Sequence, residues 1–117
     1  MSEPAGVLSQ LDETLAARRE AEPDESYVAS LYAGGSEAIL AKVAEEAEEF
    51  AEALLALAEA DEPERRSALI HEAADLWFHS LVGLHHLGLQ SGDILAELGR
   101  RQGTSGHREK AARSGSP

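Results

Sequence analysis

Residues 36–88 read SEAILAKVAEEAEEFAEALLALAEADEPERRSALIHEAADLWFHSLVGLHHLG, and this stretch decides the fold. Its apolar residues recur every three or four positions, which is the spacing of one helix face. The pattern restarts near Pro63, a residue that suits the first turn of a helix because its missing N–H is not needed there. The stretch therefore predicts two long helices, at about 36–60 and 62–87, which we expect to lie antiparallel at the centre of the fold.

Residues with capping preferences lie at the ends of these two helices. Ser36 is predicted to cap the first helix, and Asp61 followed by Glu64 forms a capping-box pattern for the second. Gly88 is a suitable C-cap. The apolar faces predicted for the pair consist of Ile39, Leu40, Val43, Phe50, Leu54 and Leu57 on the first helix and Leu69, Ile70, Leu76, Trp77, Leu81 and Leu84 on the second.

Shorter helices are predicted on either side of this pair. One covers about 5–20, one or two helical turns lie at 26–32 and end at Gly34-Gly35, and a last helix capped by Ser91 reaches about Arg101. The chain then becomes rich in Gly, Ser and charged residues. We therefore expect a domain at 1–102 and a flexible basic tail at 103–117.

Composition agrees with an all-α fold of four to five helices. The chain has 117 residues, enough for one domain, and only 4% are aromatic although 43% are hydrophobic. Ala and Leu dominate the apolar residues, whereas strands favour β-branched and aromatic ones. A helical chain this short buries limited apolar area, so we expect a dimer or a higher homo-oligomer to complete the bundle.

Charge, cysteine content and the lengths of apolar runs limit the possible binding partners and the cellular compartment. The net charge is −12, and residues 37–64 hold ten acidic side chains, which is unlike a nucleic-acid-binding surface. The absence of cysteine excludes disulfides, thiolate catalysis and zinc–sulfur sites. The first residues lack the pattern of a signal peptide, and no apolar run has membrane-spanning length. A cytoplasmic protein without a membrane or nucleic-acid partner is expected.

Four acidic residues at set spacing point to a metal site. Glu46 and Glu49 share one helix face, and so do Glu72 and Asp75 on the next long helix. If the two helices are antiparallel, the four carboxylates meet, and a hard divalent cation relieves their repulsion. Mg²⁺ prefers oxygen ligands and commonly retains waters and substrate phosphates as well. The spacing therefore predicts Mg²⁺-assisted chemistry on a phosphate compound.

The ordinary alternative is that these charges form a solvated helix face. Two features favour the metal instead. Like charges are crowded around Glu46 with only Lys42 as same-helix relief, which destabilises a bare helix. In addition, Glu72 and Asp75 lie within an otherwise apolar stretch, where carboxylates are rarely retained without a partner.

KVAEEAEE followed by HEAADLWFH resembles the MazG-like all-α nucleotide pyrophosphohydrolases, whose signature is EExxE and then ExxD on the next helix. The segments ARREAEPDESYVASLYAGG and LAELGRRQGTSGHREKAAR make the chain more similar to the phosphoribosyl-ATP pyrophosphohydrolase family of histidine biosynthesis. This resemblance implies Mg²⁺-dependent hydrolysis of phosphoribosyl-ATP to phosphoribosyl-AMP and pyrophosphate, by dimers or higher assemblies. It implies that the metal ligands are Glu46, Glu49, Glu72 and Asp75, with Glu45 beside them as a second-metal ligand or as the catalytic base.

The remaining candidate residues are basic or contain imidazole, and each has a structural alternative. Lys42 either contacts substrate phosphate or forms a salt bridge with the acidic run. His79 shares the carboxylate face and either contacts substrate or is hydrogen-bonded to a neighbour such as Asp75. Scattered arginines are usually solvated, but those near the two ends of the chain would complement a substrate with several phosphates. These candidate phosphate contacts are Arg18, Arg19, Arg100, Arg101 and Lys110.

Two other functions remain open at this point. The carboxylate motif alone is shared with house-cleaning nucleoside triphosphate pyrophosphatases of the same superfamily. A non-catalytic helical module that binds a basic partner through its acidic face would need no metal. Pyrophosphate release from phosphoribosyl-ATP, measured with and without Mg²⁺, separates the three.

Overall fold

The computed structural model describes residues 4–102, and all regular structure in this range is helical. The expectation of an all-α fold is therefore confirmed. The predicted tail at 103–117, which includes Lys110, lies outside the described residues. The elements are α1 (Pro4–Ala17), the 3-10 helix η1 (Arg18–Glu20), α2 (Tyr27–Glu59), α3 (Pro63–His86) and α4 (Ser91–Arg100).

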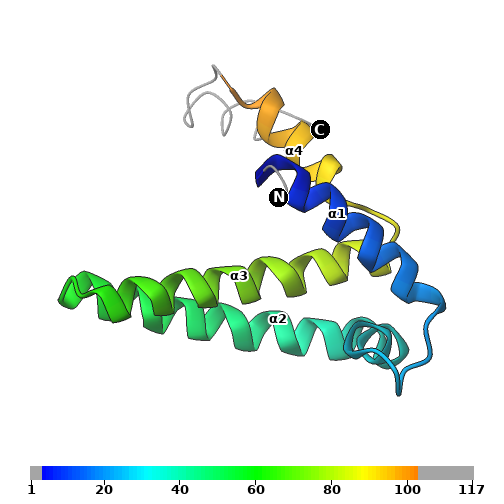
Figure 1. The fold of residues 1–117 in the computed structure, drawn as a ribbon, viewed down its shortest axis with the longest axis horizontal. Helices are drawn as coiled ribbons and strands as arrows, with labels where there is room; N and C mark the ends of the chain where they lie inside the picture. Colours follow the sequence, from blue (N-terminus) through cyan, green and yellow to red (C-terminus); the bar gives the residue numbers. More distant parts are fainter. Residues whose placement is uncertain (1–3, 103–117) are drawn as a thin grey trace, which may run out of the picture.

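Helices α2 and α3 form a long antiparallel hairpin, and α1 and α4 lie together near one end of it (Figure 1). The most extensive packing in the molecule is between α2 and α3, as the apolar spacing of residues 36–88 predicts. The other end of the hairpin, where Glu59 is followed closely by Pro63, extends away from α1 and α4 (Figure 1). None of the helices within residues 4–102 combines the length and apolar character needed to cross a bilayer.

Helix α2 is two helices joined by a kink at Gly35. This residue has φ +80° and ψ −173°, a conformation that is strained for any residue with a Cβ atom. Figure 1 shows the segment before the kink almost end-on, whereas the rest of α2 runs across the view. The break predicted at Gly34-Gly35 is therefore confirmed, and it turns the first two helical turns of α2 across the hairpin.

The ends of α2 and α3 differ from the capping predictions. Ser36, the predicted cap, lies within α2 just after the kink at Gly35. Ser26 caps α2, because its Oγ accepts a hydrogen bond from the Ala29 N–H at 3.2 Å. Glu62 rather than Asp61 is the N-cap of α3, and it makes no side-chain capping bond. The Asp61 carboxylate instead forms an ion pair with Arg66 at 2.7 Å, which removes it from the helix end.

The turn between α3 and α4 confirms Gly88 and corrects Ser91. Gly88 has φ +86°, and the N–H groups of Gly88 and Leu89 bond the carbonyls of His85 and Leu84, as in a Schellman motif. The N-cap of α4 is Gln90, in a capping box with Asp93. Ser91 is free for another contact because it is already inside the helix.

That contact is with Asp12 of α1, and it ties three helices together. The Ser91 N–H and Oγ–H donate to the two Asp12 carboxylate oxygens at 3.0 and 2.5 Å, and His85 Nε2 lies 2.8 Å from Asp12 Oδ1. Burial alone would raise the pKa of Asp12, but the hydrogen bonds from Ser91 and His85 outweigh it, and the pKa is lowered. This network, which the sequence does not reveal, fixes α1 against the α3–α4 turn.

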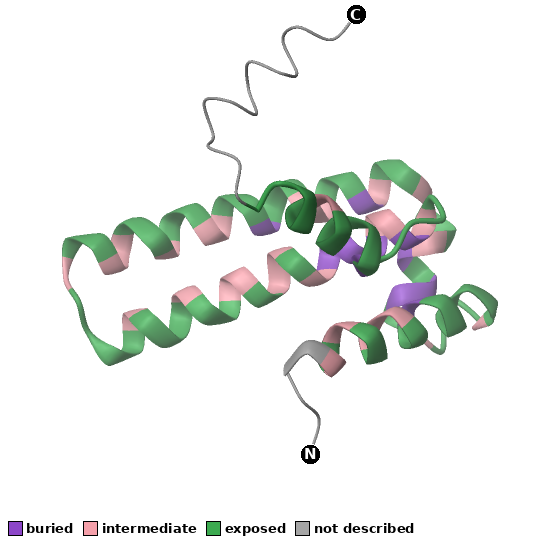
Figure 2. Ribbon diagram, turned by 90° about the horizontal axis from the view of Figure 1, so that it is seen from above, coloured by how far each residue is buried: buried purple, intermediate pink, exposed green. Residues whose placement is uncertain are grey.

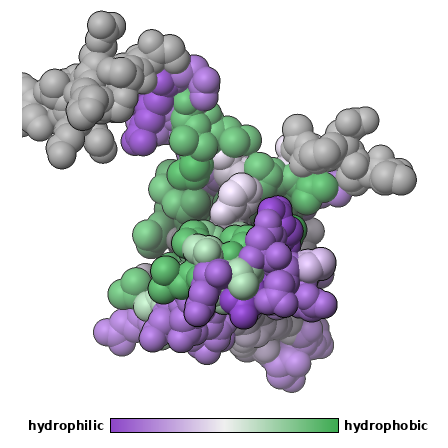
Figure 3. Space-filling view, turned by 90° about the vertical axis from the view of Figure 1, so that its left-hand side faces the viewer, coloured by the Kyte–Doolittle hydropathy of each residue, from purple (hydrophilic) through white to green (hydrophobic). Residues whose placement is uncertain are grey.

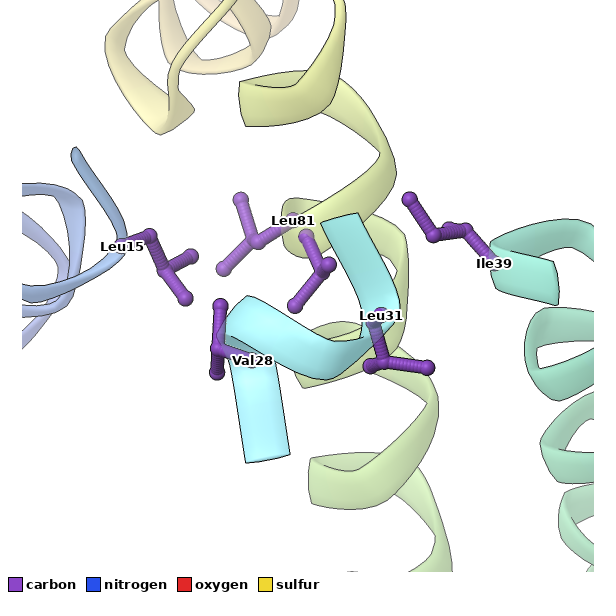
Figure 4. Close-up of a cluster of buried hydrophobic side chains, with 6 residues drawn as sticks. Leu15, Val28, Leu31, Ile39 and Leu81 are labelled. Carbon is purple, nitrogen blue, oxygen red and sulfur yellow. The ribbon is translucent and has the colours of Figure 1, made fainter. Parts of the chain in front are cut away.

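The apolar core lies at the same end of the molecule, where α1, the first segment of α2 and the second half of α3 meet (Figure 4). No residue between 47 and 78 is buried, so the outer half of the hairpin has no core of its own (Figure 2). Leu40 and Ile70, predicted on the apolar faces, are 67% and 70% exposed. The buried core side chains are Leu15, Val28, Leu31, Ile39, Leu81 and Val82.

Candidate functional site

The predicted carboxylates lie where the core of the hairpin gives way to its exposed outer half. Glu46 and Glu49 are one turn apart on α2, and Glu72 and Asp75 are one turn apart on α3. Because the helices are antiparallel, the two pairs face each other. Glu46 is only 6% exposed, which does not fit the alternative of a solvated acidic face.

The side chains form two overlapping groups with the geometry of metal ligands. Glu46, Glu49 and Glu72 each offer one oxygen, and these oxygens all lie within 4.8 Å of one another. His71, Glu72 and Asp75 form a second such group, in which His71 Nε2 is 3.2 Å from Asp75 Oδ2. Glu72 belongs to both groups. His71 was not among the residues predicted for this site, since an exposed helical histidine carries little signal.

Two oxygens in this site have no partner within the described chain. Glu46 Oε2 and Glu72 Oε2 are both buried, and neither accepts a hydrogen bond from residues 4–102. A buried carboxylate oxygen without a partner is costly. One such oxygen on each helix, at a site built only from oxygen and imidazole donors, fits a hard divalent cation.

The pKa values of the same two residues reflect this crowding. Burial raises the pKa of Glu46 above its ordinary value, and the Glu49 and Asp75 carboxylates raise it further, while His79 acts in the opposite direction. Burial also raises the pKa of Glu72, with hydrogen bonding to Glu49 and the charge of Glu49 adding to the effect. Both shifts have the same direction because each carboxylate loses solvent and lies beside other carboxylates.

Lys42 and Glu45 lie one turn before the cluster on α2. Lys42 Nζ is 3.0 Å from Glu45 Oε2 and 3.9 Å from Glu46 Oε1, so the salt bridge predicted as its structural role is present. The hydrogen bond that Lys42 donates to the Glu45 carboxylate raises the pKa of Lys42. The Glu45 side chain is 54% exposed and belongs to neither metal-ligand group, so it is open to water beside the site.

His79 is buried, with both ring nitrogens engaged by the protein. Nδ1 lies 2.8 Å from the backbone carbonyl oxygen of Asp75, and Nε2 lies 2.7 Å from the Tyr27 hydroxyl. The hydrogen bond to Asp75, predicted as the structural alternative, is thus present. A substrate contact by His79 would require one of these two bonds to break.

The arginines predicted to bind phosphates lie in other parts of the structure. Arg19 donates a hydrogen bond to the carbonyl of His85, and its guanidinium stands over the Tyr32 ring. Arg100 and Arg101 both pair with Glu97 on α4, at 2.7 and 3.0 Å. These two arginines lower the pKa of Glu97 to about 2. Arg18 is exposed at the start of η1, and the substrate contacts assigned to all four arginines stay predictions.

Comparison with known proteins supplies the reaction that the geometry alone leaves open. Residues 8–102 match the model of the phosphoribosyl-ATP pyrophosphohydrolase family. The chain is 50% identical over 108 residues to the phosphoribosyl-ATP pyrophosphatase of Hydrogenovibrio crunogenus, covering 92% of this chain and 93% of that protein. It is 51% identical over 107 residues to the phosphoribosyl-ATP pyrophosphatase of Chromobacterium violaceum, covering 92% and 93% of the two chains.

Proposed function

The chain belongs to the phosphoribosyl-ATP pyrophosphohydrolase family, and from this premise we propose how its carboxylate site performs the reaction. The enzyme hydrolyses phosphoribosyl-ATP to phosphoribosyl-AMP and pyrophosphate, a step of histidine biosynthesis. We propose that it requires Mg²⁺ and acts in the cytoplasm. The observation that carries the metal requirement is the pair of buried oxygens without partners, Glu46 Oε2 and Glu72 Oε2.

The residues that would hold the cation are Glu46, Glu49 and Glu72, with Asp75, which groups with Glu72 and His71, as the fourth predicted ligand. When bound, Mg²⁺ supplies charge neutralisation and Lewis-acid polarisation to the triphosphate. Lys42 carries the positive charge nearest to the cluster on α2, so it is placed to contact a phosphate oxygen. Its salt bridge to Glu45 would then be exchanged for a bond to the substrate.

Glu45 is the best-placed base in this arrangement. Its carboxylate is exposed beside the site, so it can hold a water molecule and accept a proton from it. The water oxygen attacks phosphorus, the anhydride bond to the pyrophosphate group breaks, and the electron pair of that bond leaves with pyrophosphate.

The assay that tests this function measures pyrophosphate release from phosphoribosyl-ATP, from ATP and from other nucleoside triphosphates, each with Mg²⁺ or EDTA. We expect turnover of phosphoribosyl-ATP only, and only with Mg²⁺. Equal turnover of the ordinary triphosphates would identify a house-cleaning pyrophosphatase instead. Undiminished turnover in EDTA would rule out the metal requirement.

We also propose that two copies of the chain pack together through their hairpins. Ile70 and Trp77 are one heptad apart on α3 and are 70% and 65% exposed, which is unusual for large apolar side chains on one helix face. Figure 3 shows that apolar side chains are concentrated in the half of the molecule nearer α1 and α4. A second hairpin would cover the outer half that has no core. Sedimentation at micromolar concentration should give the mass of a dimer or larger, and a monomer would contradict the proposal.

The pKa shifts predict a pH-dependent stability that a divalent cation removes. Because folded Glu46 and Glu72 have pKa values above the ordinary 4.5, the folded chain binds more protons than the unfolded chain just above that pH. Stability contributed by these groups is therefore lost as pH rises through the raised values. We expect the metal-free protein to melt at a lower temperature at pH 8 than at pH 5.

Mg²⁺ should reverse this loss at pH 8, because ligand at a hundred times its Kd adds about 2.7 kcal/mol to the free energy of unfolding. Scanning calorimetry at both pH values, with EDTA or Mg²⁺ at equal ionic strength, measures the effect. The prediction would be contradicted if Mg²⁺ raised the melting temperature, relative to EDTA, by no more at pH 8 than at pH 5.

A further inference from the structure

The hydrogen bond between Tyr27 and His79 joins the first turn of α2 to α3 directly beside the carboxylates. We propose that Tyr27 is a positioning residue, which acts through His79 to hold α3 against α2 so that the carboxylates are pre-arranged for a divalent cation. The inference rests on the proposed metal requirement.

The direction of the two hydrogen bonds of His79 follows from their partners. The Asp75 backbone carbonyl can only accept, so Nδ1 must carry the proton that it donates across 2.8 Å. In a neutral imidazole Nε2 is then an acceptor, and the Tyr27 hydroxyl donates to it across 2.7 Å. The two rings also meet edge to face, with centroids 5.7 Å apart. The imidazole is therefore held from both sides.

This arrangement connects the two halves of the metal site. His79 lies one turn after Asp75 and bonds its carbonyl, so the ring is fixed to the turn that carries one ligand. Its other ring nitrogen bonds Tyr27 of α2, the helix that carries Glu46 and Glu49. Tyr27 reaches this point because the kink at Gly35 turns the start of α2 across the hairpin.

A restraint at this point is needed because the site repels itself. Carboxylates from the two helices face each other, and the apolar side chains between residues 47 and 78 are at most partly buried. The buried residues nearest to the ligands in sequence are His79 and, beyond it, Leu81 and Val82. The Tyr27–His79 bond is thus the polar contact that lies between the core and the cluster. Partners of this kind, outside the ligands themselves, commonly set metal affinity.

The test compares two tyrosines of α2, of which only Tyr27 is hydrogen-bonded to His79. Tyr32 lies on the same segment of α2, and its hydroxyl donates to the Leu15 carbonyl at 2.9 Å, a bond that involves neither His79 nor a carboxylate of the cluster. Tyr27→Phe and Tyr32→Phe each remove one hydroxyl and one hydrogen bond. Binding of Mn²⁺, used as a spectroscopic substitute for Mg²⁺, is titrated by the loss of the free-ion electron paramagnetic resonance signal.

We expect Tyr27→Phe to weaken Mn²⁺ binding by roughly tenfold and Tyr32→Phe to leave it unchanged. Adding Tyr27→Phe to a His79→Gln variant should have little further effect, because Tyr27 acts through His79. Circular dichroism checks that each variant is folded.

Equal Mn²⁺ affinity in the wild type and Tyr27→Phe would overturn the inference, as would an equal loss in Tyr32→Phe or full additivity with His79→Gln. Absence of Mn²⁺ binding by the wild type is a separate result, which would overturn the metal site itself and this inference with it.

Discussion

Glu46→Gln should abolish most of the activity and should raise the thermal stability of the metal-free protein. Glutamine keeps the size of the side chain but removes the negative charge and one of the two oxygens available to a cation. We expect kcat/KM for phosphoribosyl-ATP to fall about a thousandfold, which corresponds to a loss of about 4 kcal/mol of transition-state stabilisation. The Kd for Mn²⁺ should rise in parallel.

The stability of the same variant should change in the opposite direction. Glu46 is buried among carboxylates that raise its pKa, so its ionised form opposes folding at neutral pH. An uncharged replacement relieves this repulsion, and the melting temperature in EDTA at pH 8 should rise. Glu48→Gln is the matched control, since Glu48 lies between the ligands on α2 but is exposed and belongs to neither metal-ligand group. Loss of activity in Glu48→Gln comparable to that in Glu46→Gln would contradict the assigned ligand set.

Asp12→Ala should be among the most destabilising substitutions in the chain. It removes the carboxylate that is hydrogen-bonded to the Ser91 N–H, the Ser91 hydroxyl and His85 Nε2. Ser91 and His85 are buried, so these polar groups would be left without partners. We expect the free energy of unfolding to fall by about 3 kcal/mol, as measured by urea denaturation at pH 7.

The effect should depend on pH with a definite sign. The folded pKa of Asp12 lies below the ordinary 3.8, so its contribution is complete above that value and is lost as pH falls through the folded pKa. The difference between the wild type and Asp12→Ala should therefore be smaller at pH 3 than at pH 7. The exposed neighbour Glu13 provides the control. A loss after Glu13→Ala as large as that after Asp12→Ala would show that the network is not the cause.

The sequence predicts the helices and the carboxylate cluster because both depend on local spacing. Apolar periodicity is sufficient to place α2 and α3, and two glycines together predict the kink. Glu46, Glu49 and Glu72 meet because residues three apart share a face and the helices are antiparallel. Asp75 is found beside Glu72 for the same reason.

The features that the sequence misses depend on side-chain partners that helical spacing does not reveal, some of them close along the chain and others distant. Asp61 and Ser91 are good capping residues, but their side chains bond Arg66 and Asp12 instead. The Tyr27–His79 bond joins residues 52 positions apart. Apolar periodicity also fails to distinguish a face that packs within the chain from one that is left exposed, which is why Leu40 is exposed against expectation.

The layout of the chain also has a consequence for how it folds. The ligands of α2 and α3 come from helices adjacent in sequence, so the hairpin closes a short loop, whereas the Asp12–Ser91 contact spans 79 residues. Local contacts form at a lower entropic cost than distant ones. We therefore expect α1 to dock after the transition state for folding. Asp12→Ala should then accelerate unfolding and leave the refolding rate, measured by stopped flow, nearly unchanged. The hairpin that carries the carboxylates should therefore form early in folding, and α1 should pack against it afterwards.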